Sequence, residues 1–187
     1  MRSENASIQK NDSATIKILD FGAQYADEIL QIQIECGLSV WSKSDYLGEL
    51  GKPDSIFKIA RSADQKIIGF ALARLLINSN AQNIEIQKDA PIAFDSSEIL
   101  NIAVRQSFQH QGIGQMLFDE ILRELERKKI PEIWLEVRKS NSGAINFYRK
   151  NNFKMQFERK NYYANPTENA CIFRRLIKTA AQSEIPN

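Results

Sequence analysis

Between residues 99 and 129 an apolar strand, a loop with two glycines and a long amphipathic helix follow one another directly. The strand ends at Val104, and the loop closes on Gln109-His110-Gln111-Gly112-Ile113-Gly114. Apolar residues then recur at helical spacing, which predicts a helix over 112–129. Glycines let a backbone approach a ligand closely, and a helix N-terminus offers unpaired N–H groups and a positive dipole end. The unit therefore predicts a pocket for a phosphate-bearing ligand.

The remaining sequence alternates between short apolar runs and amphipathic segments. Strands are predicted at 15–19, 56–61, 66–76, 97–104, 132–137, 155–163 and 171–177, and helices at 22–36, 42–50, 112–129 and 142–150. Ser42 or Ser44 is expected to cap the second helix, and 78–95 to form a loop with a short strand at 83–87 as one option. The early strands read as a hairpin, and the later ones alternate with helices. This order predicts a mixed sheet with helices on its faces, in the α/β or α+β class.

Length and composition predict one domain with a full core. The chain has 187 residues, of which 43% are hydrophobic and 26% charged. We expect the domain at 15–178, between a polar tail at 1–14 and a second tail at 179–187. A net charge of +2 gives no nucleic-acid footprint, and no stretch approaches the roughly 20 apolar residues of a membrane span. The sequence thus predicts no nucleic-acid or membrane partner.

Two cysteines, Cys36 and Cys171, lie far apart and match no metal or redox spacing. Both have apolar neighbours in sequence, so we expect them to pack as small hydrophobic residues. Free cysteines suit a reducing compartment. The N-terminal segment is polar and lacks the apolar region of a secretion signal. These features predict a cytoplasmic protein without a metal site.

The loop does not fit the two common nucleotide-binding motifs. A Walker loop needs Lys and then Ser or Thr after its last glycine, whereas Gly114 is followed by Gln115 and Met116. A dinucleotide fingerprint needs a third glycine three positions on, where this chain has Leu117. Both nucleotide readings are therefore excluded.

The neighbours of the loop make the motif specific. Gln109-x-x-Gly112-x-Gly114, with Asn101-Ile102-Ala103-Val104 before it, resembles the cofactor-binding segment of the GNAT family of N-acetyltransferases. The segments 134–141 (WLEVRKSN) and 144–153 (AINFYRKNNF), together with Asn161-Tyr162-Tyr163 and Trp41-Ser42, resemble the RimI-type ribosomal-protein alanine N-acetyltransferases of that family. The resemblance is tight over 98–163. It implies the GNAT fold, with a mostly antiparallel mixed sheet of six to seven strands, splayed central strands and flanking helices.

The resemblance implies acetyl-CoA as the co-substrate. Backbone groups of Ile102, Ala103 and Val104 would hold the pantetheine arm as a neighbouring strand would. The alternative is an ordinary core strand. The pyrophosphate would bind at the loop and first helical turn, through Gln109, His110, Gln111, Gly112, Ile113, Gly114 and Gln115. His110, the sole histidine, stands where many relatives carry Arg or Lys, so the backbone amides would carry most of the binding.

Glu136 is the acid that most needs an explanation, because it interrupts an apolar strand between Leu135 and Val137. Strand alternation puts Trp134, Glu136 and Arg138 on one face. One interpretation is a structural carboxylate, paired for instance with Arg138. The resemblance favours the other, in which Glu136 is the general base.

Tyr148 follows Glu136 by twelve positions, on the next predicted helix. Asn141 and Tyr148 are seven apart, so they share one helix face. Asn141 can cap that helix and reach the cofactor. In the subgroup a tyrosine at this place gives a proton to the departing CoA thiolate, while the alternative for Tyr148 is a core aromatic. Neither cysteine lies beside a base in the motif region, so direct transfer in a ternary complex is expected rather than an acyl-enzyme.

The sequence indicates the acceptor substrate less precisely than the cofactor. The resemblance implies a protein N-terminus, above all the N-terminal alanine of a ribosomal protein, with the loop 78–95 and the hairpin tip 164–169 bordering its site. A small amine, a polyamine or a lysine side chain is the enzymatic alternative. A non-catalytic acyl-CoA-binding module is a third, and the retention of Glu136 and Tyr148 argues against it.

Overall fold

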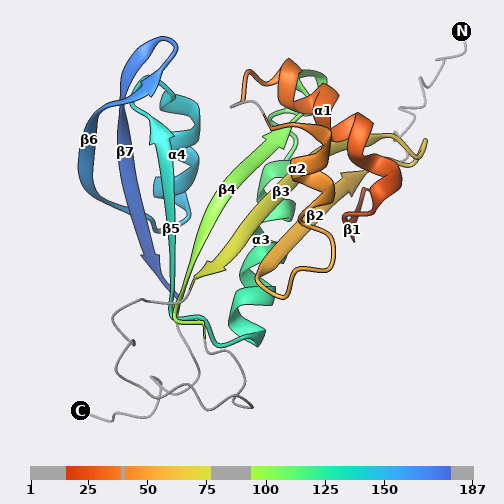
Figure 1. Ribbon diagram of the computed structural model, residues 1–187, viewed down its shortest axis with the longest axis horizontal. Coiled ribbons are helices and arrows are strands. Elements are labelled where there is room, and N and C mark those ends of the chain that lie inside the picture. Colours follow the sequence, from red (N-terminus) through yellow and green to blue (C-terminus); the bar gives the residue numbers. More distant parts are fainter. Residues whose placement is uncertain (1–15, 39–40, 77–93, 178–187) are drawn as a thin grey trace, which may run out of the picture.

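The computed structural model describes residues 16–38, 41–76 and 94–177 (Figure 1). Its strands are β1 (Lys17–Asp20), β2 (Ser55–Arg61), β3 (Ile67–Leu76), β4 (Ser96–Val104), β5 (Glu132–Arg138), β6 (Lys154–Ala164) and β7 (Thr167–Leu176). Its helices are α1 (Ala26–Glu35), α2 (Lys43–Leu47), α3 (Ile113–Arg127) and α4 (Ser142–Lys150), with 3-10 turns at Ala23–Tyr25 and Gln106–Phe108. The expected tails and the optional strand at 83–87 lie outside the described residues, so the domain limits stay a prediction.

The seven strands form one mixed sheet in the order β1-β2-β3-β4-β5-β7-β6. The β4–β5 pair is parallel, and the other neighbouring pairs are antiparallel. The predicted fold class, a mostly antiparallel mixed sheet with flanking helices, is confirmed. The parallel pair follows from the chain path, because α3 carries the chain from the end of β4 back to the start of β5.

The two central strands separate part-way along their length. β4 and β5 pair from Ser97–Ile133 to Ile99–Leu135 and no further, although β4 continues to Val104 and β5 to Arg138. Figure 1 shows the resulting V, with β4 leaning towards α1 and β5 towards α4. The splay implied by the family resemblance is therefore present, and it opens the sheet at the end of β4 from which α3 departs.

Helices cover both faces of the sheet. In Figure 1 α3 lies behind β2, β3 and β4, while α1 and α2 lie in front of them. From Phe70 onward, consecutive residues of β3 alternate between two buried clusters: Ala71 and Ala73 pack with α3, while Phe70 and Leu72 pack with α1 and α2. This double coverage explains why 67–73 reads as a continuous apolar run rather than an alternating one.

Boundaries differ from the predictions mainly where tertiary pairing overrides local signals. Ser42, one of the two expected caps, caps α2 through a capping box with Asp45, and the helix ends at Leu47 rather than at 50. The β6–β7 connection is much shorter than the predicted 164–169, because Ala164 still pairs with Thr167 and Tyr163 with Glu168. The turn itself is Asn165–Pro166. The polar residues at the ends of β6 and β7 thus extend the antiparallel pairing because each has a partner on the other strand.

Candidate active site

The loop before α3 has the backbone that its glycines predict. Gly112 is left-handed, with φ of 82°, and precedes the first helical residue. His110 is also left-handed, at φ of 60°. No side chain caps α3, and its first turn carries no acid. The N–H groups at the positive end of this helix are therefore left for a ligand.

Two side chains, one from the loop and one from the end of α1, hydrogen-bond to the last residue of β4. Gln109 Nε2 donates to the Val104 carbonyl at 3.0 Å, and the Cys36 thiol donates to the same oxygen at 3.3 Å. Cys171 is buried, as expected.

Gln115 and Asn151 exchange two amide hydrogen bonds of 2.8 and 3.0 Å, which join α3 to the end of α4. The side chain of Gln115 is thus structural, which leaves its backbone for a ligand.

A cavity of about 440 Å³ lies between β4, the loop, the start of α3 and α4. Ten of the twelve predicted cofactor residues line it: Ile102, Val104, Gln109, His110, Gly112, Ile113, Gly114, Gln115, Asn141 and Tyr148. Ala103 does not, because its side chain packs on the opposite face with α1. Gln111 is exposed, and its amide bonds to Ser107. Phe108, Gly143, Ala144 and Phe147 complete the wall and were missed by the sequence analysis.

Asn141 and Tyr148 reach this cavity from α4. Asn141 caps the helix, its side-chain oxygen accepting from Ala144 N at 3.0 Å, as predicted. Tyr148 is 8% exposed and packs against Phe147 and Phe153. Its hydroxyl makes no hydrogen bond to the described residues. Burial, and then the nearby Tyr163, raise the pKa of Tyr148 above that of an ordinary tyrosine. Tyr148 is thus both part of the core and part of the cavity wall.

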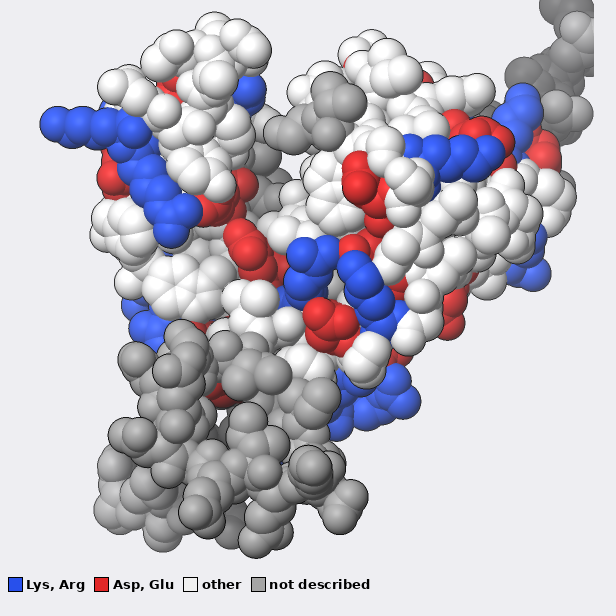
Figure 2. Space-filling view, viewed as in Figure 1, with Lys and Arg blue, Asp and Glu red and all other residues white. Residues whose placement is uncertain are grey.

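Glu136 lines a second cavity, of about 210 Å³. Its walls come from Trp41, from β4 (Glu98, Ile99, Leu100 and Asn101) and from Tyr162 and Tyr163 of β6. The two cavities flank β4, where Asn101 lines one and its neighbour Ile102 lines the other. In the space-filling view a hollow separates the two halves of the molecule, and acidic and basic side chains gather below it (Figure 2).

A β-bulge produces this arrangement. Leu72 of β3 pairs with Asn101 and the next residue, Ala73, pairs with Ile99, so Leu100 has no partner in the ladder. The extra residue shifts the alternation of β4, which puts Glu98 and Asn101 on the α1 side and Ile102 on the α3 side. The strand can therefore serve one cavity on each face.

The partner of Glu136 differs from the one considered in the sequence analysis. Arg159 of β6 forms an ion pair with Glu136, whose side chain is 18% exposed. Arg138 instead pairs with Glu168 at 3.3 Å and lies over the Tyr163 ring, 4.1 Å from its centroid. Arg138 and Glu136 share a face of β5, but the β6–β7 hairpin gives each a separate partner, Arg159 of β6 for Glu136 and Glu168 of β7 for Arg138.

Glu98 was missed by the sequence analysis, because a single acid near the start of a predicted strand carries no signal of its own. Burial, and then the charge of Glu136, raise the pKa of Glu98, while Arg159 and Arg74 oppose this. Arg74 is the cross-strand neighbour of Glu98. Its Nη2 atom nevertheless lies 2.5 Å from Glu49 Oε1. Among the described residues, Glu98 has no ion pair or hydrogen bond.

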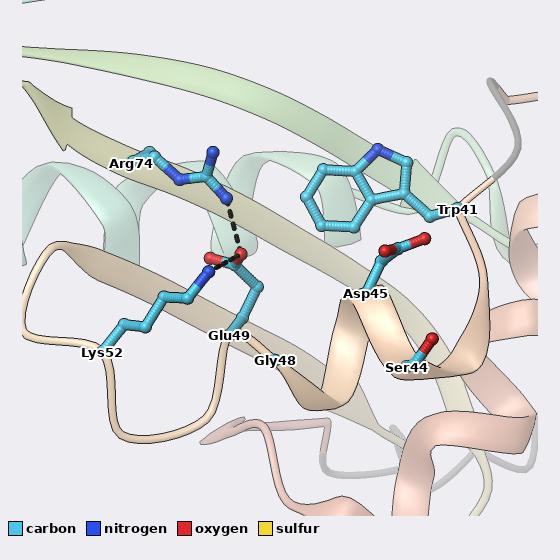
Figure 3. A pocket seen from close by; sticks show the side chains of 7 residues that line it. All are labelled: Trp41, Ser44, Asp45, Gly48, Glu49, Lys52 and Arg74. Atoms are coloured by element: carbon cyan, nitrogen blue, oxygen red, sulfur yellow. Dashed lines mark hydrogen bonds and ion pairs between the residues drawn. The ribbon is translucent and has the colours of Figure 1, made fainter.

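A third cavity, of about 500 Å³, adjoins the second at Trp41, whose side chain lines both. Figure 3 shows Arg74 and Lys52 converging on the Glu49 carboxylate beside the indole ring. The Glu49 side chain is 2% exposed, and Lys52 Nζ lies 2.9 Å from it. Glu49 thus holds Arg74 away from Glu98.

A family model described as "Acetyltransferase (GNAT) family" matches residues 26–153. The chain belongs to this acetyltransferase family. The [ribosomal protein bS18]-alanine N-acetyltransferase of Salmonella typhimurium is 29% identical over 133 residues, which cover 71% of this chain and 77% of the relative. The resemblance to this family and to the ribosomal-protein alanine N-acetyltransferases is therefore confirmed.

Two solved structures share the fold. The ribosomal-protein-S18-alanine N-acetyltransferase of Escherichia coli superposes with a TM-score of 0.73 at 24% identity, covering 92% of this chain and all of that one. Naa20 of Chaetomium thermophilum, solved with a bisubstrate analogue, gives a TM-score of 0.75 at 19% identity, with 90% of each chain covered. At these identities the superpositions bear on the architecture.

Two further features concern the expected partners. None of the helices within 16–38, 41–76 and 94–177 is long and apolar enough to cross a membrane. Over the same ranges, no three His, Cys, Asp or Glu side chains are grouped to hold a metal ion.

Proposed function

We propose that this protein transfers the acetyl group of acetyl-CoA to the N-terminal α-amine of a protein, with the N-terminal alanine of a ribosomal protein as the first acceptor to test. The observation that carries the proposal is that two cavities flank β4, one at the N-terminus of α3 and one lined by Glu136. The similarity to bS18-alanine N-acetyltransferases supports the acceptor class. We place the reaction in the cytoplasm.

The residues of the first cavity suit acetyl-CoA. The uncapped N-terminus of α3 and the left-handed Gly112 present backbone N–H groups to a pyrophosphate. Ile102 and Val104 belong to the part of β4 that has left β5, where a pantetheine arm would take the place of a neighbouring strand. Ala103 and Gln111, whose side chains point elsewhere, would take part through their backbones. Acetyl-CoA supplies the activated thioester.

Glu136 is assigned the role of general base. At pH 7 roughly a tenth of protein α-amines are neutral, with a pKa of about 7.7–8.0, against about one in 2,500 lysine amines. A carboxylate acting directly or through a water molecule can therefore serve an α-amine without extreme tuning. Its ion pair with Arg159 fixes the side chain in the cavity.

Tyr148 is assigned to the leaving thiolate. An ordinary tyrosine with a pKa of about 10 would protonate a thiolate of about 8.5 at a cost of roughly 2 kcal/mol. Because burial raises the pKa of Tyr148, full proton transfer is more uphill here. We therefore assign Tyr148 as a strong hydrogen-bond donor to the sulfur, with the proton following as the C–S bond breaks.

An acceptor panel tests the proposal. Purified protein and acetyl-CoA are offered peptides that differ at the first residue, the same peptides with a blocked N-terminus and an internal lysine, and polyamines. We expect transfer to free N-termini, alanine foremost, and a mass increase of one acetyl group lost on blocking. Transfer to polyamines alone, or to lysine in blocked peptides alone, would reject the proposed acceptor.

A further inference from the structure

The cavity lined by Glu136 is the one that would hold the acceptor amine, and it is called the acceptor cavity below. It contains a second carboxylate, Glu98, to which the proposed mechanism gives no role. Glu98 lies on β4 and Glu136 on the parallel neighbour β5, and both line the same cavity. The nearby cations are engaged elsewhere, because Arg74 pairs with Glu49 and Arg159 with Glu136. A half-buried acid without a partner among the described residues is costly unless a ligand uses it.

The reaction needs more than one proton acceptor. An α-amine with a pKa near 8 arrives mostly as an ammonium at pH 7. Its nitrogen must lose one proton to gain a lone pair, and a second when the amide forms. A single base would have to release the first proton to solvent before it took the second. Two carboxylates in one cavity remove that constraint.

We propose that Glu98 and Glu136 form a carboxylate pair that binds the protonated α-amine, and that Glu98 takes its first proton while Glu136 takes the second. This deepens the proposed function and rests on it. The ammonium provides the cation that Glu98 lacks, in a cavity whose other walls are aromatic residues and residues of β4. A neutral or N-blocked group would leave the charge of Glu98 uncompensated, which also gives selectivity for free amines.

The proton and electron balance closes within the site. Proton transfer to Glu98 leaves its carboxyl neutral and the amine with a lone pair. The nitrogen then forms a bond to the thioester carbonyl carbon, its second proton passes to Glu136, and the C–S bond breaks with its electron pair on sulfur. The thiolate takes a proton from Tyr148. One of the two protons held by the pair restores Tyr148 through water, and the other is released to solvent.

The charges around Glu98 favour this role. Arg74 faces it from β3, Glu136 from β5, and Arg159, Tyr162 and Tyr163 from β6. The raised pKa of Glu98 brings the acid closer to that of the ammonium it must deprotonate, which makes it a better proton acceptor than an exposed carboxylate. A hydrogen bond to Glu136, with partial burial, raises the pKa of Tyr162, so that ring remains a neutral wall.

The test is the pH profile of kcat/KM for an alanine-terminated peptide, in wild type, in Glu98→Gln and in the matched surface variant Glu120→Gln. Wild type and Glu120→Gln should keep their activity below pH 8, because the ammonium form is used. Glu98→Gln should depend on the neutral amine. Its kcat/KM should therefore be about tenfold lower than that of wild type at pH 7, and should fall about tenfold more for each pH unit below 7. The variants should converge above pH 9.

A second readout does not depend on turnover. With CoA bound, the affinity of Glu98→Gln for the free-amine peptide should fall severalfold, while affinity for the N-acetylated peptide stays unchanged. An unaltered pH profile, or equal loss for both peptides, would overturn the proposal. If Glu98→Gln has a lowered melting temperature, Glu98→Asp decides: a profile of wild-type shape supports the role, and one like Glu98→Gln refutes it. A wild type that acetylates no N-terminus refutes the proposed function instead.

Discussion

Arg159 of β6 forms an ion pair with Glu136 of β5, and its charge also lowers the pKa of Glu98. Arg159 therefore acts on both carboxylates of the acceptor cavity. In the Arg159→Gln variant this opposing charge is lost, so the pKa of Glu98 rises further. Glu98 then reaches its basic form only at higher pH, and the acid limb of kcat/KM against pH should move upward. Arg123→Gln, on the exposed side of α3, should leave that limb in place.

Glu49 acts on the same cavity in the opposite direction. Glu49→Gln weakens the hold on Arg74, which is then free to turn to its cross-strand neighbour Glu98. A nearer cation lowers the pKa of Glu98, so the acid limb of the activity profile should move downward. A shift in the same direction as that of Arg159→Gln would contradict this geometry.

Glu49 also predicts a pH dependence of stability. Burial works to raise the pKa of Glu49, but hydrogen bonding to Lys52 and the charge of Arg74 lower it overall. A lowered pKa in the folded state gives stabilisation that is present above about pH 4.3 and is lost as the pH falls through the folded value. Glu49→Gln should therefore reduce the free energy of unfolding by about 2 kcal/mol at pH 7. Urea titrations should show this difference shrinking at pH 3.

Gly112 and Gly51 provide a matched pair for testing the loop. Both have positive φ, 82° and 74°, and an added Cβ would meet nothing within 4 Å at either. Replacement by alanine should cost about 1 kcal/mol of stability in both cases, because of the left-handed backbone alone. Gly112→Ala should in addition weaken acetyl-CoA binding by up to about tenfold, which is about 1.4 kcal/mol. If calorimetry gave the same affinity for acetyl-CoA in Gly112→Ala and in Gly51→Ala, Gly112 would not belong to the binding site.

The assigned chemistry predicts unequal losses for Glu136 and Tyr148. Glu136→Gln should lower kcat by about 10²–10⁴, the usual contribution of a general base. Tyr148→Phe should lower it by about 10–100-fold, as expected for a lost hydrogen bond to a developing charge worth about 1.5–3 kcal/mol. Tyr25→Phe serves as the control, because Tyr25 lies on the 3-10 turn before α1 and lines neither cavity. Full activity in both site variants would reject the catalytic assignment.

Local sequence signals predicted most elements because local physics decided them. The capping box at Ser42, the cap at Asn141 and the left-handed Gly112 each depend on residues within a few positions. The amphipathic stripe of α3 and the apolar run of β3 likewise reveal their own burial. The family motif added the cofactor loop, Glu136 and Tyr148, because these residues lie within a short, characteristic stretch.

Charge pairing was not predictable in the same way. Glu136 lies two residues from Arg138 in sequence, yet pairs with Arg159 from β6. Arg74 pairs with Glu49 rather than with Glu98 beside it on β4. Side chains of this length choose among partners brought together by the fold, and that choice is invisible without the β6–β7 hairpin and α2 in place.

The sequence by itself indicated most of the elements, because periodicity and caps act over a few residues. Its short motifs indicated the family and the residues that we propose for acetyl-CoA. Only the tertiary structure showed the Glu136-lined cavity that we propose for the acceptor. A bulge at Leu100 turns Glu98 and Asn101 to one face of the sheet and Ile102 to the other, and the divergence of β4 from β5 opens the space between them. Both depend on strand pairing between segments far apart in the chain, which no local pattern encodes.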